Sequence, residues 1–254
     1  MKAIIKIFLF VFSIALVSTA CVVPFGPRLV RGSGDVIIEE RKVSGFDEIL
    51  VTGAGKVIVT QGSSETLSIE TDDNLMEYIE TNVRGNTLEI GFTDNTVFSK
   101  GGGGRALDPT DGFIFRVGVV NLNAISVSGA ARFEIEKIKT DQLAINLSGA
   151  GDVMVDDLNA TQLTVGVSGA GDVAIAGKVE IQHVVMSGFG RYRADDLESQ
   201  EGSVTISGAG GADVWVTENL DVTISGAGDV KYYGNPSVDP EISGVGRIQS
   251  QGEK

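Results

Sequence analysis

The sequence predicts an all-β fold, a right-handed parallel β-helix whose coils are about 18–20 residues long. Two observations predict the solenoid: a short phrase repeats at a nearly fixed interval, and apolar residues alternate with polar ones on both sides of it. A third supports the all-β class, because no segment has the length and periodicity of a substantial helix. The phrase is Ser-Gly-Ala-Gly-Asp-Val, with variants, opening at Ser128, Ser148, Ser168, Ser187, Ser207, Ser225 and Ser243. An upstream copy begins at Thr52.

The repeated phrase is interpreted as the corner of a coil. An apolar residue precedes the serine, and others follow it by five and seven places, as Leu147, Val153 and Val155 do around Ser148. Alternation with period two on both sides of a turn predicts two short strands, each with one face inward. Glycine permits the sharp corner between them. An antiparallel sandwich is the alternative; it would explain the alternation but not the repeat of 18–20 residues.

The first 21 residues are predicted to be a signal peptide. Lys2 and Lys6 form a basic start, and residues 7–17 form an apolar run too short to span a bilayer. Small residues then precede Cys21, the only cysteine of the chain, as in a bacterial lipoprotein signal in which that cysteine is lipidated. Ser18 stands where such signals usually carry an aliphatic residue, so ordinary cleavage stays an alternative. Both predict export, and one cysteine excludes an intrachain disulfide.

Four further segments are expected after the signal. Residues 22–34, with prolines and glycines, suit a tether, and residues 35–92 form an N-terminal β part in which residues 73–79 make one or two helical turns. Residues 93–112 are expected to be a Gly-rich flexible loop, and residues 113–250 the β-helix repeat region.

The chain is strongly acidic. It has 34 Asp and Glu against 20 Lys and Arg, a net charge of −14. Nucleic-acid binding depends on Lys and Arg neutralising phosphates, so this balance disfavours a nucleic-acid partner. Electrostatic docking on anionic lipid is disfavoured for the same reason.

The charged residues that follow the corners are the candidates for a catalytic or cation-binding site. Stacking in register would place Asp152 above Asp172, with Arg191 beside them, which could form a paired-carboxylate site for general acid/base or cation chemistry. The favoured interpretation is a solvated corner in which Asp caps backbone amides. Calcium is disfavoured because each turn offers at most one carboxylate. No catalytic, cofactor or metal-binding residue is predicted, and His183, the only histidine, is interpreted as structural.

Aromatic residues suggest a contact surface. Tyr192 and Tyr232 fall in the apolar phase and are expected in the core. Trp215 and Tyr233 lie one step out of that phase, so we expect them to face solvent and to be the contact residues.

The chain resembles the bacterial auto-transporter adhesin head (GIN) domain family, a domain of unknown function. The resemblance rests on the lipoprotein-like start, Val43-Ser44-Gly45-Phe46-Asp47, Gly53-Ala54-Gly55 and the Ser-Gly-Ala-Gly ladder, and covers about residues 34–250. It implies a right-handed β-helix similar to that of pectin lyases, without their catalytic residues. Adhesion is the role proposed for the family by analogy, and it offers no defined functional residues.

Together these observations predict a non-enzymatic surface or periplasmic lipoprotein with an adhesive or structural role. The alternative is a carbohydrate-active lyase or hydrolase using the stacked carboxylates. The expected partners are the membrane, through a lipid anchor at Cys21, and glycans or proteins at the cell surface. The expected location is the cell envelope, anchored in the outer membrane. An open solenoid end exposes unpaired backbone, which also predicts a homo-oligomer.

Overall fold

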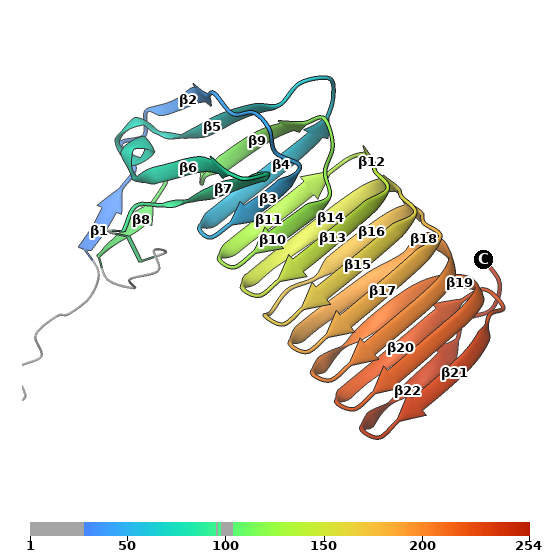
Figure 1. Cartoon of the computed structure of the whole chain (residues 1–254). Coiled ribbons are helices and arrows are strands. Elements are labelled where there is room, and N and C mark those ends of the chain that lie inside the picture. Colours follow the sequence, from blue (N-terminus) through green and yellow to red (C-terminus); the bar gives the residue numbers. More distant parts are fainter. Residues whose placement is uncertain (1–27, 95, 98–103) are drawn as a thin grey trace, which may run out of the picture.

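The fold is a β-solenoid of about six turns, in which strands make up 69% of the chain and helix 3%. The computed structural model describes residues 28–94, 96–97 and 104–254. Figure 1 shows the coils stacked in one direction, from an N-terminal cap to the terminal strands β21 and β22. The predicted parallel β-helix is therefore confirmed, and the chain does not adopt the alternative sandwich. Within the described residues, no helix has the length and apolarity needed to cross a membrane.

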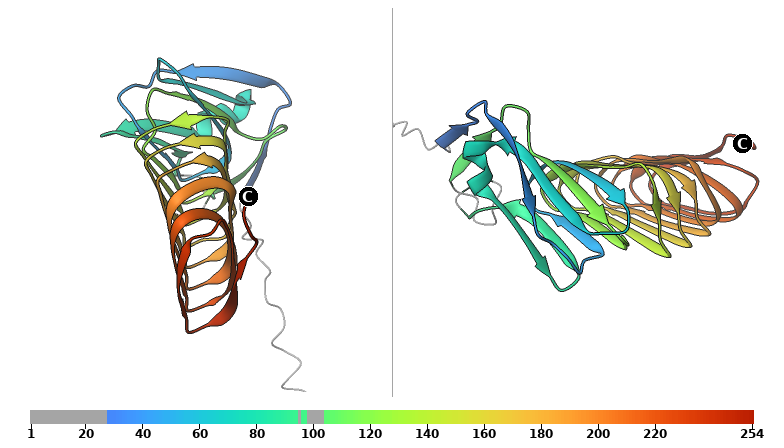
Figure 2. Two further views of the ribbon diagram at one scale, coloured as in Figure 1. Left: turned by 90° about the vertical axis from the view of Figure 1, so that its right-hand side faces the viewer. Right: turned by 90° about the horizontal axis from the view of Figure 1, so that it is seen from above.

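Each coil has two long sides joined at the Ser-Gly corner. The first side precedes the corner and consists of β10 (Ala124–Val127), β13 (Gln142–Leu147), β15 (Gln162–Val167), β17 (Ile181–Met186), the later halves of β18 (Phe189–Ile206) and β19 (Ala209–Ile224), and β21 (Ser237–Ile242). The second side follows the corner and consists of β11 (Ala130–Ile135), β14 (Ala150–Asn159), β16 (Val173–Lys178), the early halves of β18 and β19, β20 (Ala227–Tyr233) and β22 (Val245–Ser250). The short β12 (Ile138–Lys139) belongs to a third edge. Figure 2 shows these two sides as a flattened coil seen along the rod.

Neighbouring coils pair in parallel and in register, so equivalent residues stack. Leu143 lies beside Leu163 on the first side, and Val153 beside Val173 on the second. These inward residues are buried, as are their equivalents along the rod. The apolar positions that alternate in the sequence therefore form one continuous core between the two sides.

A polar network interrupts this core. The Tyr192 hydroxyl donates to Gln182 Oε1 at 3.0 Å, and Gln182 Nε2 donates to Ser199 Oγ at 2.7 Å. Ser199 Oγ in turn donates to the Trp215 carbonyl at 2.9 Å. The three side chains are buried, and burial holds the pKa of Tyr192 far above its ordinary value. The prediction that Tyr192 lies in the core is confirmed, whereas Tyr232 is only partly buried against it.

The corner requires glycine because adjacent coils approach too closely for a side chain. A Cβ added to Gly149 would lie 2.0 Å from the Gly129 carbonyl oxygen of the preceding coil. The next residue, Ala150, donates its N–H to that same oxygen at 2.9 Å. The equivalent distance at the other corners is 1.9–2.1 Å, at Gly129, Gly169, Gly188, Gly208, Gly226 and Gly244. The repeated glycine is therefore a packing requirement of the stack.

The first coil of the stack lies far upstream in the sequence. Strands β3 (Glu48–Val51) and β4 (Ala54–Gln61) pair in parallel with β10 and β11 on one side. On their other side they pair with β7 (Thr87–Phe92) and β9 (Ile114–Val119). The expected division into an N-terminal β part and a later repeat region therefore crosses a continuous ladder, because the Thr52 copy of the corner stacks directly under that of Ser128.

Antiparallel strands cap the N-terminal end of the rod. They are β6 (Ile79–Arg84) on β7, β5 (Thr66–Asp72) on β9, and β2 (Val36–Arg41) on β5, with the 3₁₀ helix η1 (Asp73–Tyr78) between β5 and β6. The helical turns expected at residues 73–79 are thus present as η1. The expected tether and flexible loop contain a parallel pair, β1 (Arg28–Arg31) with β8 (Arg105–Asp108). Neither β1 nor β8 alternates between buried and exposed residues, unlike β3 and β10 of the same length.

A buried carboxylate fastens this cap. Asp72 Oδ1 accepts hydrogen bonds from the Gly34 N–H at 2.8 Å and from Thr110 Oγ1 at 2.7 Å, and Oδ2 accepts one from the Thr110 N–H at 2.8 Å. These bonds, led by the one from the Thr110 hydroxyl, hold the pKa of Asp72 below its ordinary value. Asp72 therefore joins three segments distant in sequence, and its charged form stabilises the cap.

The opposite end of the rod is uncovered. Ile242 is 46% exposed, although the equivalent residues Ile206 and Ile224 of the two preceding coils are fully buried. Figure 1 places β21 and β22 at the far end, with the last residues of the chain running back along the rod instead of over its end. The terminal coil therefore exposes side chains that every internal coil buries.

Candidate contact surfaces

The second side carries a ladder of ion pairs. Asp152 pairs with Arg132 at 2.8 Å and Asp172 with Arg193 at 2.9 Å. Arg191 reaches Asp213 at 3.6 Å. Charges of both signs occur along this side, and Asp152, Asp172 and Asp213 each face an arginine from a neighbouring coil. Exposed pairs of this kind contribute little to stability, but they leave few unpaired charges on this side.

The aspartates after the corner also hold backbone amides of the following coil. Asp172 Oδ1 accepts the Arg191 N–H at 2.9 Å, and Asp229 Oδ1 accepts the Arg247 N–H at 3.0 Å. Asp152 Oδ1 lies 3.4 Å from the Asp172 nitrogen, a longer contact of the same kind. This is the amide-capping role favoured from the sequence. Asp152 and Asp172 are engaged by arginine and by backbone, an arrangement that does not leave a free carboxylate pair.

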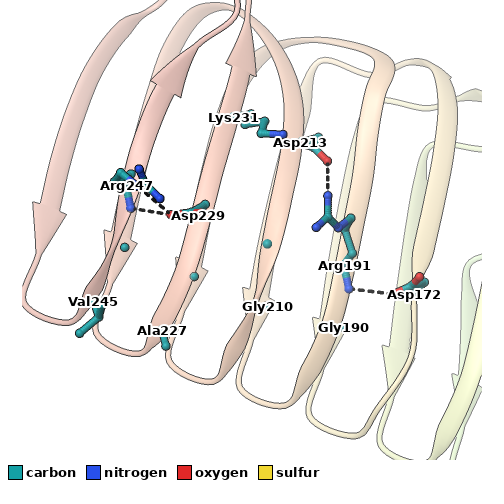
Figure 3. A pocket seen from close by; sticks show the side chains of 13 residues that line it. Asp172, Gly190, Arg191, Gly210, Asp213, Ala227, Asp229, Lys231, Val245 and Arg247 are labelled. Atoms are coloured by element: carbon teal, nitrogen blue, oxygen red, sulfur yellow. Dashed lines mark hydrogen bonds and ion pairs between the residues drawn. The ribbon is translucent and has the colours of Figure 1, made fainter.

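A shallow groove of about 740 Å³ crosses the corner of the C-terminal coils (Figure 3). Gly190, Gly210 and Gly228 line it, and charged residues of both signs surround it, among them Arg191 and Asp229. Ala227 and Val245 also line it, at the corners of their coils. Within the described residues, no three His, Cys, Asp or Glu side chains gather to form a metal site.

The first side presents an uncharged face. Two adjacent outward rows on β10, β13, β15, β17 and the later half of β18 carry ten residues without a formal charge when His183 is neutral: Ala124, Ser126, Ala144, Asn146, Thr164, Gly166, His183, Val185, Ser203 and Thr205. A third outward row, at the beginning of four of these strands, consists of Gln142, Gln162, Ile181 and the charged Glu201. Glu48 and Asp221 continue the row from Ala124 to Ser203 on the flanking coils. Outward and buried residues alternate along each strand, which makes this face flat and regular. We call these ten residues the uncharged face.

A depression of about 260 Å³ lies on the edge of the uncharged face. Asn146, Gly166 and Val185 line it, together with the corner serines Ser148, Ser168 and Ser187. Gly166 creates it, because that position has no side chain between those of the neighbouring coils. His183 lies in the adjacent outward row, paired with Thr164 and Ser203. The depression thus offers hydroxyl and amide groups without a charge.

Trp215 and Tyr233 are neighbouring rungs of the ladder, as the stacking of the coils requires. Both residues are partly exposed, and their role as contact residues stays a prediction. The ammonium group of Lys254 lies 5.6 Å from the Trp215 ring centroid and 5.0 Å from that of Tyr233. The chain itself therefore covers the predicted aromatic surface. The other predicted site residue, Cys21, lies outside the described residues.

Comparison with known proteins gives the family. The model of the family described as "Putative auto-transporter adhesin, head GIN domain" matches residues 45–236, which is most of the chain. The chain belongs to this family. No curated protein sequence matches it significantly. The resemblance that the sequence motifs carried is thereby confirmed.

Solved structures of other proteins share the fold. A structure named a putative adhesin from Bacteroides fragilis NCTC 9343 matches with a TM-score of 0.79 and 27% identity, over 87% of this chain and 99% of that one. A structure named a putative lipid binding protein from Parabacteroides distasonis ATCC 8503 has a TM-score of 0.68 and 24% identity, over 88% and 99%. A structure named a putative adhesin from Parabacteroides merdae ATCC 43184 has a TM-score of 0.66 and 21% identity, over 88% and 99%. The last two likenesses concern the fold alone.

In this GIN-domain protein, the uncharged face could have been found from the sequence, by reading the outward residues of each coil. Once the inward phase is set by residues such as Leu163 and Val165, the residues between them, Thr164 and Gly166, must point outward. Comparing these outward residues coil by coil separates the uncharged first side from the charged second side. The ladder of ion pairs follows from the same comparison.

Proposed function

We propose that this protein is a non-enzymatic, exported interaction module that adheres to glycans or proteins through the uncharged face of its solenoid. One observation supports this more than any other: ten adjacent outward positions lack a formal charge in a chain of net charge −14. The centres of protein interfaces are depleted of charged residues, which are costly to desolvate. A partner that bound the second side would have to displace or desolvate its ion pairs.

The adhesive role agrees with the family description and with the printed name of the Bacteroides fragilis relative. The hydroxyl and amide groups around Gly166 can donate and accept hydrogen bonds, which suits a glycan or a polar protein surface. An array of glycans and of envelope proteins, probed with the chain lacking residues 1–21, tests this function directly. Specific binding would support it, and the absence of any bound glycan or protein would overturn it.

We propose that the chain is anchored through a lipid on Cys21 in the outer membrane. The basic start, the short apolar run and the single cysteine support this assignment. Six residues lie between Cys21 and Arg28, the start of β1, and seven residue steps span at most about 25 Å. The N-terminal cap would therefore lie near the membrane and the terminal coil far from it. Cys21→Ser should move the protein from the membrane fraction to the soluble fraction; an unchanged distribution would exclude the lipid anchor.

The enzymatic alternative predicts a different result. If Asp152 and Asp172 formed a catalytic pair, the chain would cleave polysaccharides, and the double change to Asn would abolish cleavage while leaving the fold intact. The engagement of both carboxylates by arginine and backbone supports the non-enzymatic assignment. Cleavage that disappears in the double variant would overturn that assignment.

We propose in addition that the terminal coil mediates self-association. Exposed Ile242 and partly buried Ile248 pair with the buried core residues Ile224 and Val230 of the preceding coil, so a second copy could bury apolar surface at this end. Pro240 lies in β21 and has no N–H to donate. Association would therefore bury side chains instead of extending the ladder along β21.

A further inference from the structure

The third edge of the rod contains a niche made by a shortened coil. The pairing of β18 with β19 shifts between Ala194 and Glu198: Ala194 pairs with Val214, and Glu198 pairs with the next residue, Trp215. The three residues between them have no ladder partner in the following coil: Leu197 is buried in the core, whereas Asp195 is partly exposed and Asp196 is exposed, near the Trp215 rung. The change from coils of 20 residues to coils of 18 produces this bulge.

An ammonium group already occupies the niche. Lys254 Nζ lies 2.5 Å from Asp196 Oδ1 and 3.8 Å from Asp195 Oδ2, and it donates to the Asp195 carbonyl oxygen. The same nitrogen lies over the faces of Trp215 and Tyr233, at 5.6 and 5.0 Å. Aromatic faces attract cations, and carboxylates complete their neutralisation. Two aromatic rings and two carboxylates thus converge on one primary ammonium.

The segment that carries Lys254 is attached by few contacts. The Gln251 N–H donates to the Tyr232 carbonyl at 2.8 Å, and the Gly234 N–H donates to the Gly252 carbonyl at 2.9 Å. Beyond Gly252 the segment is held at the niche through the lysine side chain. Such a short attachment can be displaced by a competing cation without disturbing the stacked coils.

We propose that this niche, formed by Trp215, Tyr233, Asp195 and Asp196, is a recognition site for a lysine side chain of a partner protein, and that Lys254 occupies it as an intramolecular competitor. The proposal rests on the proposed interaction function and names a chemical class of partner for it. A tethered competitor acts at an effective concentration in the millimolar range. A partner must therefore present several lysines or bind elsewhere as well, for example on the uncharged face.

Trp215 provides a direct measurement because it is the only tryptophan. Its fluorescence in the full chain, in the Lys254→Ala variant and in a Lys139→Ala control is titrated with a Gly-Gly-Lys-Gly-Gly peptide. Removing the competitor should tighten binding by about tenfold in Lys254→Ala, whereas Lys139→Ala should behave as wild type. Adding Asp195→Asn and Asp196→Asn to Lys254→Ala should abolish the response, as should acetylation of the peptide lysine.

Three results would overturn the proposal. The first is no response in Lys254→Ala, and the second is an unchanged response after both aspartates are neutralised. The third is a response to free cadaverine but not to the peptide, which would assign the site to a small diamine instead of a protein. Each of these outcomes is separate from failure of the uncharged face, because none of the variants alters that face and its binding is measured on the array.

Discussion

The corner glycines are required because a single added Cβ atom would prevent neighbouring coils from stacking. A Cβ at Gly169 would lie 1.9 Å from the Gly149 carbonyl oxygen, which already accepts the Ala170 N–H at 2.9 Å. Neither strand can move away without breaking the ladder on both sides of the corner. The Ser-Gly phrase repeats because every coil meets the same restriction, and no ligand is needed to explain it.

Gly169→Ala should therefore lower the free energy of unfolding by about 3 kcal/mol or more, as overpacking against rigid backbone does. Gly166→Ala is the matched control on the same coil. Its Cβ would meet only the flexible end of Asn146, at 3.2 Å, so stability should stay equal or rise by about 0.5 kcal/mol. Chemical denaturation of both variants measures the difference. Equal stability would contradict the close approach of the coils.

Asp72 gives the cap a dependence on pH. Its carboxylate accepts three hydrogen bonds and its pKa is lowered on folding, so the folded state binds its proton less readily than the unfolded state. The resulting stabilisation is fully present above the ordinary carboxyl pKa near 4 and is lost as the pH falls through the lower folded value.

Asp72→Asn should accordingly lower the melting temperature at neutral pH, and the gap to wild type should shrink as the pH falls below about 4. Asp111→Asn, at an exposed position next to Thr110, serves as the control and should leave the gap small at every pH. Thermal melts from pH 2 to 8 measure both. A gap that stays constant across this range would refute the assigned role of the charge.

At the scale of elements, the terminal coil differs from the coils it follows. The core position held by Ile224 is fully buried, and the equivalent Ile242 is 46% exposed because no coil covers it. Self-association through this end predicts a dimer in light scattering of the chain lacking residues 1–21. Ile242→Glu should give the monomer, whereas Met154→Glu, also partly exposed but on the second side of an internal coil, should not. A wild-type monomer would exclude this association.

The elements also mark what the sequence could and could not predict. The repeat region was predictable because each coil carries the same corner and the same apolar phase. The Thr52 copy of the corner was visible in the sequence, but the insertion of β3 and β4 between β7–β9 and β10–β11 was not predictable, because that copy lies far outside the regular interval of the repeat. The pair of β1 with β8 was not predictable either, because neither strand buries alternate residues. The alternation of apolar and polar residues predicted that Trp215 lies outside the core, but it could not predict that Lys254 lies over its ring.

At the scale of the whole molecule, the two sides and the third edge of the rod carry different groups of residues. The core and the glycine corner hold the coils together, and the second side carries paired charges whose aspartates cap the backbone of the following coil. The first side carries neither of these devices, and the ten outward residues of its uncharged face have no formal charge. The third edge holds the lysine niche. We therefore propose that adhesion uses the first side of the solenoid.

One comparison tests that claim most directly. Thr164→Glu and Ala174→Glu each add one carboxylate to the same coil, at outward positions on the first and second sides respectively. Binding to the glycan or protein found on the array is measured for both and for wild type. The account predicts a loss of about tenfold or more for Thr164→Glu, because the new charge must be desolvated, and little change for Ala174→Glu. Loss of binding in Ala174→Glu with Thr164→Glu unaffected would contradict it.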